Sequence, residues 1–429
     1  MMRDFELWLN TRFLFGRDVH KKAGSVLRQM GVSRVLIHHD SGAYLYDTGL
    51  LESVRRDLED NGMAVRELPG VKPNPRLDLV YEGIRCVKEN QIDFILAIGG
   101  GSVIDSSKAI GAGALYDGDV WDFFTKGIRV SQSVPVGVIL TCPATGSESG
   151  DVSVINNTRT GQKLLTSSQA LRPVLAFMNP ELTVSLPACV TACSVADMFS
   201  HVCERYFTPD DEIGVIDRMA EGILKTLVEI GPALIKDPHN YGYRAQVMWI
   251  ASIAHNDTVG IGRIQDWATH EIGNELSALY DTPHGMTLSA VMGSWMRYVY
   301  RNHMERFARY AYEVFGVSRQ TGPGQAALEG IAATEDFFRS MGLPVSIKEA
   351  GITDCDFETM LDHINFRNGN QTIGGITALD REDVRNILMM SAGLTQSRPG
   401  KRSRAGFSGK YFLLPVACTN GLCYSKINC

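Results

Sequence analysis

The chain has 429 residues, of which 21% are charged and 44% hydrophobic, a composition typical of a globular protein long enough for two domains. Its formal charge of −6 is mild, and no basic cluster occurs before residue 398, which argues against a nucleic-acid partner. No apolar run reaches the ~18 residues that a membrane span requires, the N-terminus lacks a signal-peptide pattern, and the nine cysteines, without C-x-x-C spacing, predict reduced thiols in the cytoplasm.

Strand-like and helical patterns alternate over the first part of the chain. Short apolar runs predict strands at 32–38, 63–68, 93–98 and 134–140, and amphipathic periodicity predicts helices at 48–62 and 76–90. This alternation is typical of right-handed parallel units, so we expect a Rossmann-like α/β domain with a parallel sheet. A hairpin expected around 156–165 would extend that sheet.

Helical periodicity dominates from residue 187 to about residue 392. We therefore expect an α/β domain over 1–186 and an all-helical domain over 187–393. Residues 394–429 carry six Lys or Arg and no Asp or Glu. A basic tail can bind a polyanion or a membrane face, but we expect a poorly ordered appendage without a role in catalysis.

A glycine-rich turn follows the predicted strand at 93–98. Gly99, Gly100, Gly101 and Ser102 lie between this strand and a helical run, where backbone amides at a helix N-terminus can bind a phosphate. The spacing is not G-x-G-x-x-G, and a purely structural turn is the alternative. This turn is therefore one candidate half of a dinucleotide site.

A second loop of small residues, TCPATGSESG at 141–150, follows another predicted strand. Its hydroxyls, among them those of Thr141, Thr145 and Ser147, can bond a ribose or a phosphate. Asp40 follows the first strand, where a carboxylate can accept hydrogen bonds from an adenosine ribose and would repel a 2′-phosphate. The alternative for Asp40 is a turn aspartate that bonds its own backbone.

Four residues of the helical part are of types that bind metals. Asp197 and His201 stand four positions apart in a helical pattern and so share one face, while His270 and His284 flank a predicted helical corner. A single histidine on an apolar helix is more often a hydrogen-bonded core residue, and an Asp-x-x-x-His pair is usually a surface contact. One carboxylate and three imidazoles together suit zinc or ferrous iron, not calcium or magnesium.

The helix expected to carry His270 has apolar residues at helical spacing: Ile264, Trp267, Ala268, Ile272, Leu276 and Leu279. The next helix is expected to begin with Thr282 as its cap and Pro283 at its first position.

With both halves of the chain in view, the sequence resembles the iron-containing (metal-dependent, group III) alcohol dehydrogenase family, closest to its butanol dehydrogenase and aldehyde reductase branch. The resemblance runs from about Phe5 to Ala392. It rests on five motifs: GVKPNP at 70–75, AIGGGSVIDSSK at 97–108, LTCPATGSES at 140–149, ADMFSH at 196–201 and QDWATHEIGNELSALYDTPHG at 265–285.

The resemblance implies a dehydroquinate synthase-like fold, in which an α/β dinucleotide domain precedes an all-helical metal domain and the active site lies between them. It implies one divalent metal, iron or zinc, bound by Asp197, His201, His270 and His284. It also implies that NAD or NADP binds in a cleft lined by Asn74, Gly100, Gly101, Ser102, Asp105, Thr141 and Lys163, with Lys163 near the ribose or phosphate.

Three features depart from the family pattern. Asn274 stands where relatives in this branch commonly have a histidine one turn after the third ligand, so a proton relay through that position is in doubt. Residues 39–42, HDSG, stand where this branch often has a glycine-rich segment, which puts the branch's NADP preference in doubt. The residues after Ala392 have no counterpart that we identify.

The expected function is a metal-dependent NAD(P)-linked alcohol dehydrogenase or aldehyde reductase that transfers a hydride between nicotinamide and a short to medium primary alcohol or aldehyde. One alternative is a dehydroquinate synthase-like lyase, which the lack of a basic cluster beside the metal residues disfavours. The other is a catalytically impaired nucleotide-binding protein. We also expect a homodimer.

Overall fold

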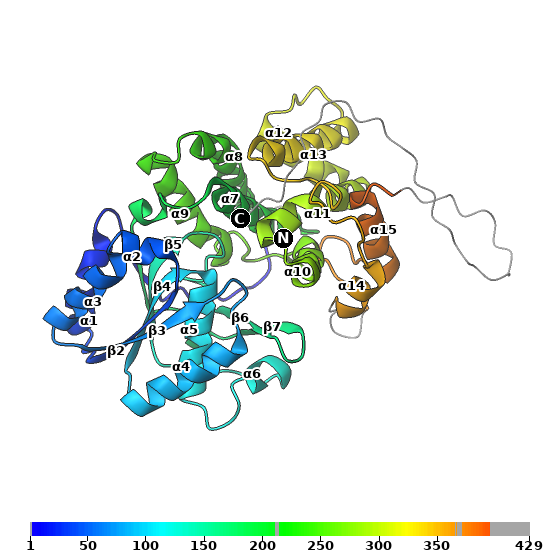
Figure 1. Ribbon diagram of the computed structural model, residues 1–429. Helices are drawn as coiled ribbons and strands as arrows, with labels where there is room; N and C mark the ends of the chain where they lie inside the picture. Colours follow the sequence, from blue (N-terminus) through cyan, green and yellow to red (C-terminus); the bar gives the residue numbers. More distant parts are fainter. Residues whose placement is uncertain (1, 211–213, 365, 367–370, 395–429) are drawn as a thin grey trace. The chain divides into compact units, whose positions relative to one another are not determined.

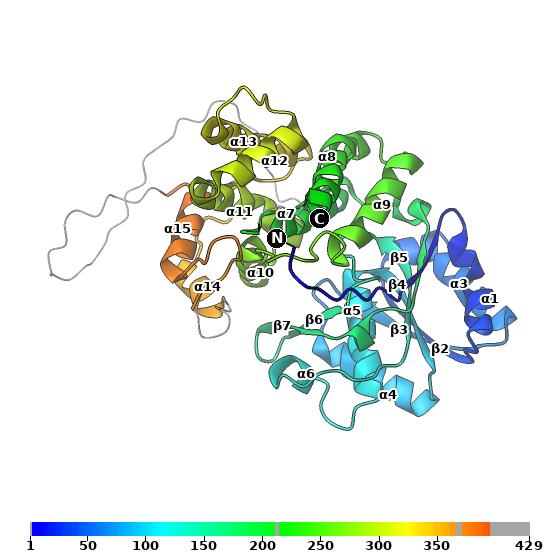
Figure 2. The ribbon, with the colours of Figure 1, turned by 180° about the vertical axis from the view of Figure 1, so that it is seen from behind.

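The computed structural model describes residues 2–210, 214–364, 366 and 371–394. The chain divides into two compact units, one ending at Gln265 and one beginning at Asp266. Figures 1 and 2 show the chain from opposite sides, coloured along the sequence.

The first unit contains a parallel sheet of six strands in the order β1-β8-β5-β4-β2-β3. A separate antiparallel hairpin is formed by β6 and β7. The bounds are β1 Arg12–Phe15, β2 Arg34–Asp40, β3 Ala64–Val71, β4 Phe94–Gly100, β5 Val136–Cys142, β6 Val152–Asn157, β7 Gln162–Ser167 and β8 Leu175–Met178.

Helices cover both faces of the six-stranded sheet (Figure 1). On one face, Val35 and Ile37 of β2 belong to a buried cluster with residues of α1 and α3, and on the other face Leu36 belongs to a cluster with residues of α4 and α5. Side chains of a strand alternate between faces, so most positions of a strand covered on both sides are apolar. This explains the unbroken apolar runs of β2, β4 and β5.

The remaining helices of the first unit are α7, α8 and α9, and the second unit is helical, with α10 to α15. The bounds are α1 Ala23–Gln29, α2 Ala43–Asp47, α3 Leu50–Asp60, α4 Leu77–Asn90, α5 Gly101–Ala114, α6 Asp122–Thr125, α7 Ala188–Tyr206, α8 Gly214–Lys236, α9 Tyr241–His255, α10 Ala268–Tyr280, α11 His284–Val299, α12 Met304–Phe315, α13 Pro323–Ser340, α14 Phe357–His363 and α15 Arg381–Ser391.

The structure confirms the predicted fold class, a parallel α/β sheet followed by a helical part. The hairpin prediction was wrong in one respect, because β6 and β7 pair only with each other and do not extend the six-stranded sheet. Strands β1 and β8 were not anticipated, since each has four residues and is too short to show a periodicity.

The described residues contain no helix long and apolar enough to cross a membrane. Among the described cysteines, Cys86, Cys142 and Cys355 are free thiols. The prediction of reduced thiols was wrong for Cys189, which is disulfide-bonded. The prediction for the basic tail concerns residues 394–429, of which all but Leu394 lie outside the described part of the chain.

Candidate coenzyme-binding and metal-binding residues

The glycine turn lies where β4 passes directly into α5, with Gly100 as the residue before the helix and Ser102 in its first turn. A Cβ atom on Gly101 would lie 2.3 Å from Thr145 Oγ1, and one on Gly100 would lie 2.9 Å from the Cβ of Cys142. Glycine is therefore required for the turn to approach the loop after β5. The turn leaves the N-terminus of a helix of 14 residues at the carboxyl end of the sheet, a place suited to a phosphate.

Asp105 and Ser147 join these two segments. Ser147 Oγ donates to Asp105 Oδ1 at 2.5 Å, and the backbone N–H of Val154 donates to Asp105 Oδ2 at 3.1 Å. Burial raises the pKa of Asp105, and the nearby charges of Lys108 and Lys163 oppose the rise. Both residues were predicted to contact a coenzyme, and in this structure they hold α5 against the loop after β5.

Lys108, which the sequence analysis did not single out, is the centre of this network. Its fully buried ammonium group donates to Ser147 Oγ at 2.6 Å, to the Gly150 carbonyl at 3.0 Å and to the Val152 carbonyl at 2.8 Å. Burial lowers the pKa of Lys108 to about 8. A carboxylate and an amine three positions apart in a helix of small apolar residues were the visible signal for this pair.

Asp40 is the last residue of β2, and both of its carboxylate oxygens are bonded. Oδ1 accepts from the backbone N–H of Gly42 at 2.8 Å, and Oδ2 accepts from the Tyr44 hydroxyl at 3.1 Å. The Tyr44 oxygen also lies 3.0 Å from Thr141 Oγ1 on β5. The turn aspartate and the ribose contact were alternatives in the sequence. The Gly42 bond is the turn contact, and the ribose contact stays a prediction.

Two further predicted coenzyme residues lie near this edge of the first unit. Asn74 adopts a left-handed conformation with φ 56° in the connection between β3 and α4. Lys163 lies on β7, close enough to Asp105 for its charge to affect that carboxyl group.

Asp197 and His201 lie on consecutive turns of α7. The Nδ1 atom of His201 lies 2.9 Å from the Asp197 carbonyl and 3.0 Å from Asp197 Oδ1, and the Asp197 side chain is only 5% exposed. Such contact with Nδ1 orients the ring and leaves Nε2 as the nitrogen suited to a metal.

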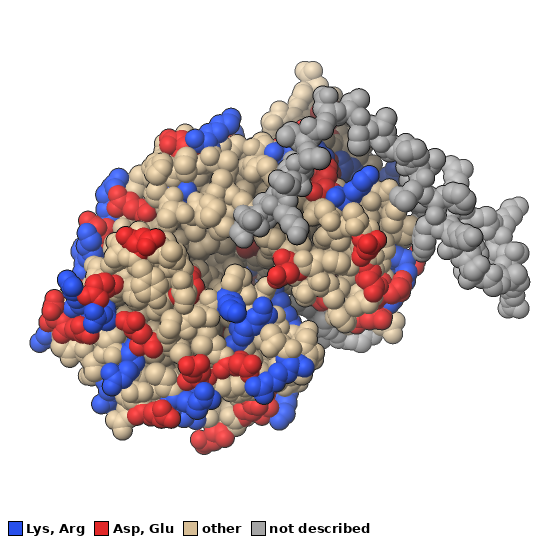
Figure 3. Space-filling model, viewed as in Figure 1, with Lys and Arg blue, Asp and Glu red and all other residues tan. Residues whose placement is uncertain are grey.

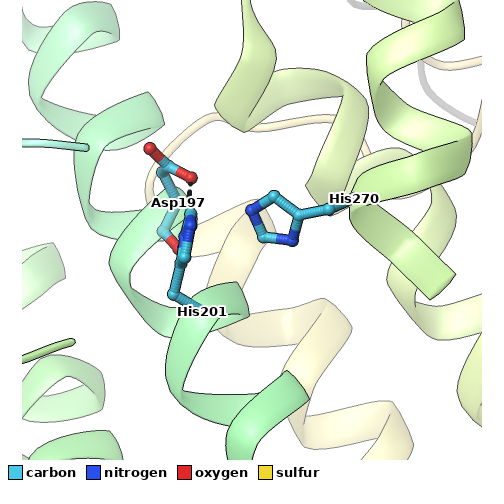
Figure 4. A group of neighbouring side chains, drawn as sticks. All are labelled: Asp197, His201 and His270. Atoms are coloured by element: carbon cyan, nitrogen blue, oxygen red, sulfur yellow. Dashed lines mark hydrogen bonds and ion pairs between the residues drawn. The ribbon is translucent and has the colours of Figure 1, made fainter. Parts of the chain in front are cut away.

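One possible ligand atom from each of Asp197, His201 and His270 lies within 4.8 Å of the other two (Figure 4). A buried carboxylate with two imidazoles is a donor set that fits a divalent ion such as zinc or iron. His284, the predicted fourth ligand, is outside this group, although its ring centroid is 5.2 Å from that of His270. Asn274 lies one turn after His270 on α10 and is partly buried.

The helical corner differs from its prediction. Helix α10 begins at Ala268, so Ile264 and Trp267 precede it, and Leu279 is 38% exposed and does not face the core. Trp267 adopts a left-handed conformation with φ 71°, and its ring lies 5.4 Å from that of His270. Thr282 does not cap α11, because Pro283 is the residue before that helix and no side chain caps it.

His255 is a further residue that the sequence analysis missed. It is the last residue of α9, and its ring centroid lies 3.7 Å from that of His201. Its Nδ1 is hydrogen-bonded to the Ala251 carbonyl at 2.8 Å, and Arg205 donates to the backbone carbonyls of both histidines. A lone histidine in a helical pattern gave no signal for this contact, which depends on how α7 and α9 pack.

Comparison with known proteins gives one family over almost the whole chain. Residues 10–180 match the family described as iron-containing alcohol dehydrogenase, and residues 191–392 match the Fe-containing alcohol dehydrogenase family, C-terminal. These matches confirm the resemblance inferred from the motifs.

Individual relatives point to the same family. The NADH-dependent butanol dehydrogenase A of Clostridium acetobutylicum is 35% identical over 91% of this chain and 100% of its own length. The NADPH-dependent aldehyde reductase of Escherichia coli is 37% identical over 84% of this chain and 92% of its own. The crystal structure of a butanol dehydrogenase A from Thermotoga maritima, 36% identical, superimposes with a TM-score of 0.87 over 91% of this chain and 99% of the other. The chain therefore belongs to the iron-containing alcohol dehydrogenase family.

Proposed function

We propose that this protein is an NAD(P)-dependent oxidoreductase acting on CH–OH groups, which interconverts a short to medium primary alcohol and its aldehyde. The observation that carries the proposal is the convergence of Asp197, His201 and His270, whose possible ligand atoms lie within 4.8 Å of one another. The names of the relatives, two of which are a butanol dehydrogenase and an aldehyde reductase, support this substrate class.

The proposed metal ligands are Asp197, His201, His270 and His284. A divalent metal held by them would supply Lewis-acid activation of an alcohol or aldehyde oxygen. The chain's own contribution is orientation, because Asp197 and the α7 backbone fix the His201 ring while Arg205 fixes the carbonyl end of that helical turn. His284 would have to approach the other three ligands, and its contact with the His270 ring supports this role.

The proposed coenzyme residues surround the carboxyl ends of β2, β4 and β5. They are Asp40, Asn74, Gly99, Gly100, Gly101, Ser102, Asp105, Thr141, Thr145, Ser147 and Lys163. The coenzyme would accept or deliver the hydride. The backbone amides that begin α5 would bind its phosphates, and Lys108 would keep the Ser147 loop in place for the nicotinamide half.

With Asn274 in place of a histidine, the proton released on alcohol oxidation needs another route. Oxidation of an alcohol releases the hydroxyl proton, and an amide side chain does not titrate, so Asn274 can only hold a water molecule or the coenzyme ribose by hydrogen bonds. We propose that the proton leaves through such a water molecule.

We propose a domain boundary at residue 186, with coenzyme residues in 1–186 and metal residues in 187–393, a boundary supported by the two family matches.

We also propose a homodimer. Its support is β1, an edge strand of the sheet, together with the exposed apolar side chains of Phe5, Trp8 and Phe15 beside it in sequence. Sedimentation of the full chain tests the dimer. We propose a cytoplasmic location, which the free thiols of Cys86, Cys142 and Cys355 support and the disulfide of Cys189 does not.

In the view of Figure 3, Lys and Arg side chains are interspersed with Asp and Glu over the described surface. This mixture and the net charge of −6 support a small-molecule substrate and not a nucleic acid.

The test is a set of initial rates with butanal and either NADH or NADPH, each with added zinc, ferrous iron or a chelator. We expect turnover that the chelator abolishes and a metal restores. The His270→Ala variant should lose activity, and the matched His239→Ala variant, which changes an exposed histidine, should not. Full activity of His270→Ala in the presence of chelator would exclude the metal-dependent mechanism.

A further inference from the structure

Tyr44 connects two segments of the first unit that are far apart in sequence. It lies on the short helix α2, directly after β2, and its hydroxyl donates to Asp40 Oδ2 at 3.1 Å. The same oxygen lies 3.0 Å from Thr141 Oγ1 on β5. Strand β4 lies between β2 and β5, so these hydrogen bonds cross the carboxyl end of the strand that leads into the glycine turn.

The direction of the hydrogen bonds follows from the donors available. A phenol has one proton, and an ionised carboxylate only accepts, so Tyr44 donates to Asp40 and Thr141 donates to Tyr44. Burial raises the pKa of Tyr44, so the phenol keeps its proton at neutral pH. Both hydroxyl donors, of Thr141 and Tyr44, therefore point toward the negative charge of Asp40, an arrangement in which the two hydrogen bonds strengthen each other.

The consequence is a carboxylate that cannot rotate freely. Oδ1 is held by the Gly42 backbone and Oδ2 by Tyr44, while each oxygen keeps a further lone pair for another donor. Two adjacent hydroxyls of a ribose are such donors. A phosphate on the same ribose would instead meet a fixed negative charge. The electrostatic repulsion between the phosphate and the carboxylate is large where water is restricted.

We propose that Tyr44 is a positioning residue for coenzyme selection, which holds Asp40 through the Thr141–Tyr44–Asp40 hydrogen bonds so that the protein accepts NADH and rejects NADPH. The proposal rests on the function proposed above and adds the coenzyme preference and the residue that enforces it. It differs from a direct contact by Asp40 alone, because it assigns part of the discrimination to a side chain that need not touch the coenzyme.

The test uses the full chain and the Tyr44→Phe variant, which keeps the ring and removes only the hydroxyl. Dissociation constants for NADH and NADPH are measured by nicotinamide fluorescence, and kcat and KM for each coenzyme with butanal. We expect the NADH preference of the wild type to fall roughly tenfold in Tyr44→Phe, the scale of one hydrogen bond to a charged group. The change should lie in the binding constants, with kcat for NADH nearly unchanged.

Two further variants complete the test. Thr141→Val removes the other end of the hydrogen-bonded chain and should reduce the preference in the same direction. Tyr46→Phe is the matched control, since Tyr46 lies on the same helix and is 55% exposed, and it should keep the wild-type ratio. Thermal unfolding of each variant shows whether the fold is kept.

The outcomes separate the two proposals. A wild type that turns over neither coenzyme with any aldehyde defeats the proposed function, and this inference with it. A wild type that works with NADH but whose preference is the same in Tyr44→Phe defeats this inference alone. A wild type that prefers NADPH, or a Tyr44→Phe variant that binds both coenzymes more tightly by the same factor, also defeats it, the latter by showing that the phenol obstructs the site.

Discussion

The imidazole of His255 lies against that of His201, with ring centroids 3.7 Å apart and planes inclined by 47°. The two residues lie on different helices, α9 and α7, and Arg205 donates to the backbone carbonyl of each. His201 is a proposed metal ligand. His255 is thus a packing surface for the ring of that ligand and limits the orientations that it can adopt.

This contact predicts an effect of His255 on metal affinity. Removal of the ring in His255→Ala should weaken metal binding about tenfold, within the range seen for residues that orient a ligand. His255→Phe keeps a ring against His201 and should retain most of the affinity. The measurement is competition between the protein and a chelator for zinc or cobalt, and His239→Ala on the exposed connection before α9 is the control. Equal affinity in His255→Ala would show that the contact is irrelevant to the site.

The hydrogen bonds of Asp266, a residue of the second unit, predict that it also affects metal affinity. Its Oδ1 accepts from the backbone N–H of Ala268 at 3.0 Å, and its Oδ2 accepts from those of Gly375 and Ile376 at 2.8 and 2.9 Å. The buried carboxylate thereby fixes the start of α10, next to the left-handed Trp267 whose ring lies beside His270. Asp266 is thus placed to set the direction of the His270 side chain.

We expect Asp266→Asn to lower metal affinity about tenfold, because an amide nitrogen cannot accept from the N–H groups that the carboxylate now binds. The absorption spectrum of the cobalt-substituted protein should also shift, since the direction of one imidazole changes. Asp354→Asn is the control, at a carboxylate that is exposed. An unchanged cobalt spectrum and affinity in Asp266→Asn would contradict the prediction.

The sequence was sufficient for the strands and turns whose residues are apolar without interruption. Strand β4 is buried along nearly its whole length, and its passage into the glycine turn could be predicted because this strand has no polar side chain. Strands β1 and β8 could not, since four residues carry too little pattern.

Contacts between segments distant in the sequence could likewise not be predicted. Tyr44 and Thr141 are 97 positions apart and meet because of the strand order β5-β4-β2, which a single sequence does not specify. The His201–His255 contact depends on how two helices pack. The residues that bear chemistry could be recognised by type and spacing, but the residues that position them are ordinary in sequence and are identified only by their partners.

The buried hydrogen bonds of Lys108 predict a large loss of stability when its charge is removed. The Lys108→Met variant keeps most of the volume of the side chain but leaves Ser147 and the carbonyls of Gly150 and Val152 without their donor. It also removes the cation that lies 4.0 Å from Asp105 Oδ1. Breaking a buried pair of charges costs about 3 kcal/mol, and we expect a fall of that size in the free energy of unfolding, measured in urea. The Lys225→Met variant, at an exposed position of α8, should change it little.

His38 predicts how stability depends on pH. It is fully buried in β2, where Nδ1 is bonded to the Leu68 carbonyl and Nε2 to Ser106 Oγ, each at 2.8 Å. Burial lowers its pKa from 6.5 to about 4. Between these two values the unfolded chain binds a proton that the folded chain does not, so the contribution of His38 to stability is present above pH 6.5 and is lost as the pH falls toward 4.

Lowering the pH from 7 to 5 should therefore reduce the free energy of unfolding by about 2 kcal/mol through His38 alone. Urea unfolding of the wild type and of His38→Gln at both pH values measures this contribution, with a chelator present so that metal release does not contribute. The variant keeps an amide able to bond Leu68 or Ser106 but cannot titrate, so its stability should fall less over the same interval. Parallel losses in the two proteins would show that His38 is protonated in the folded state at pH 5.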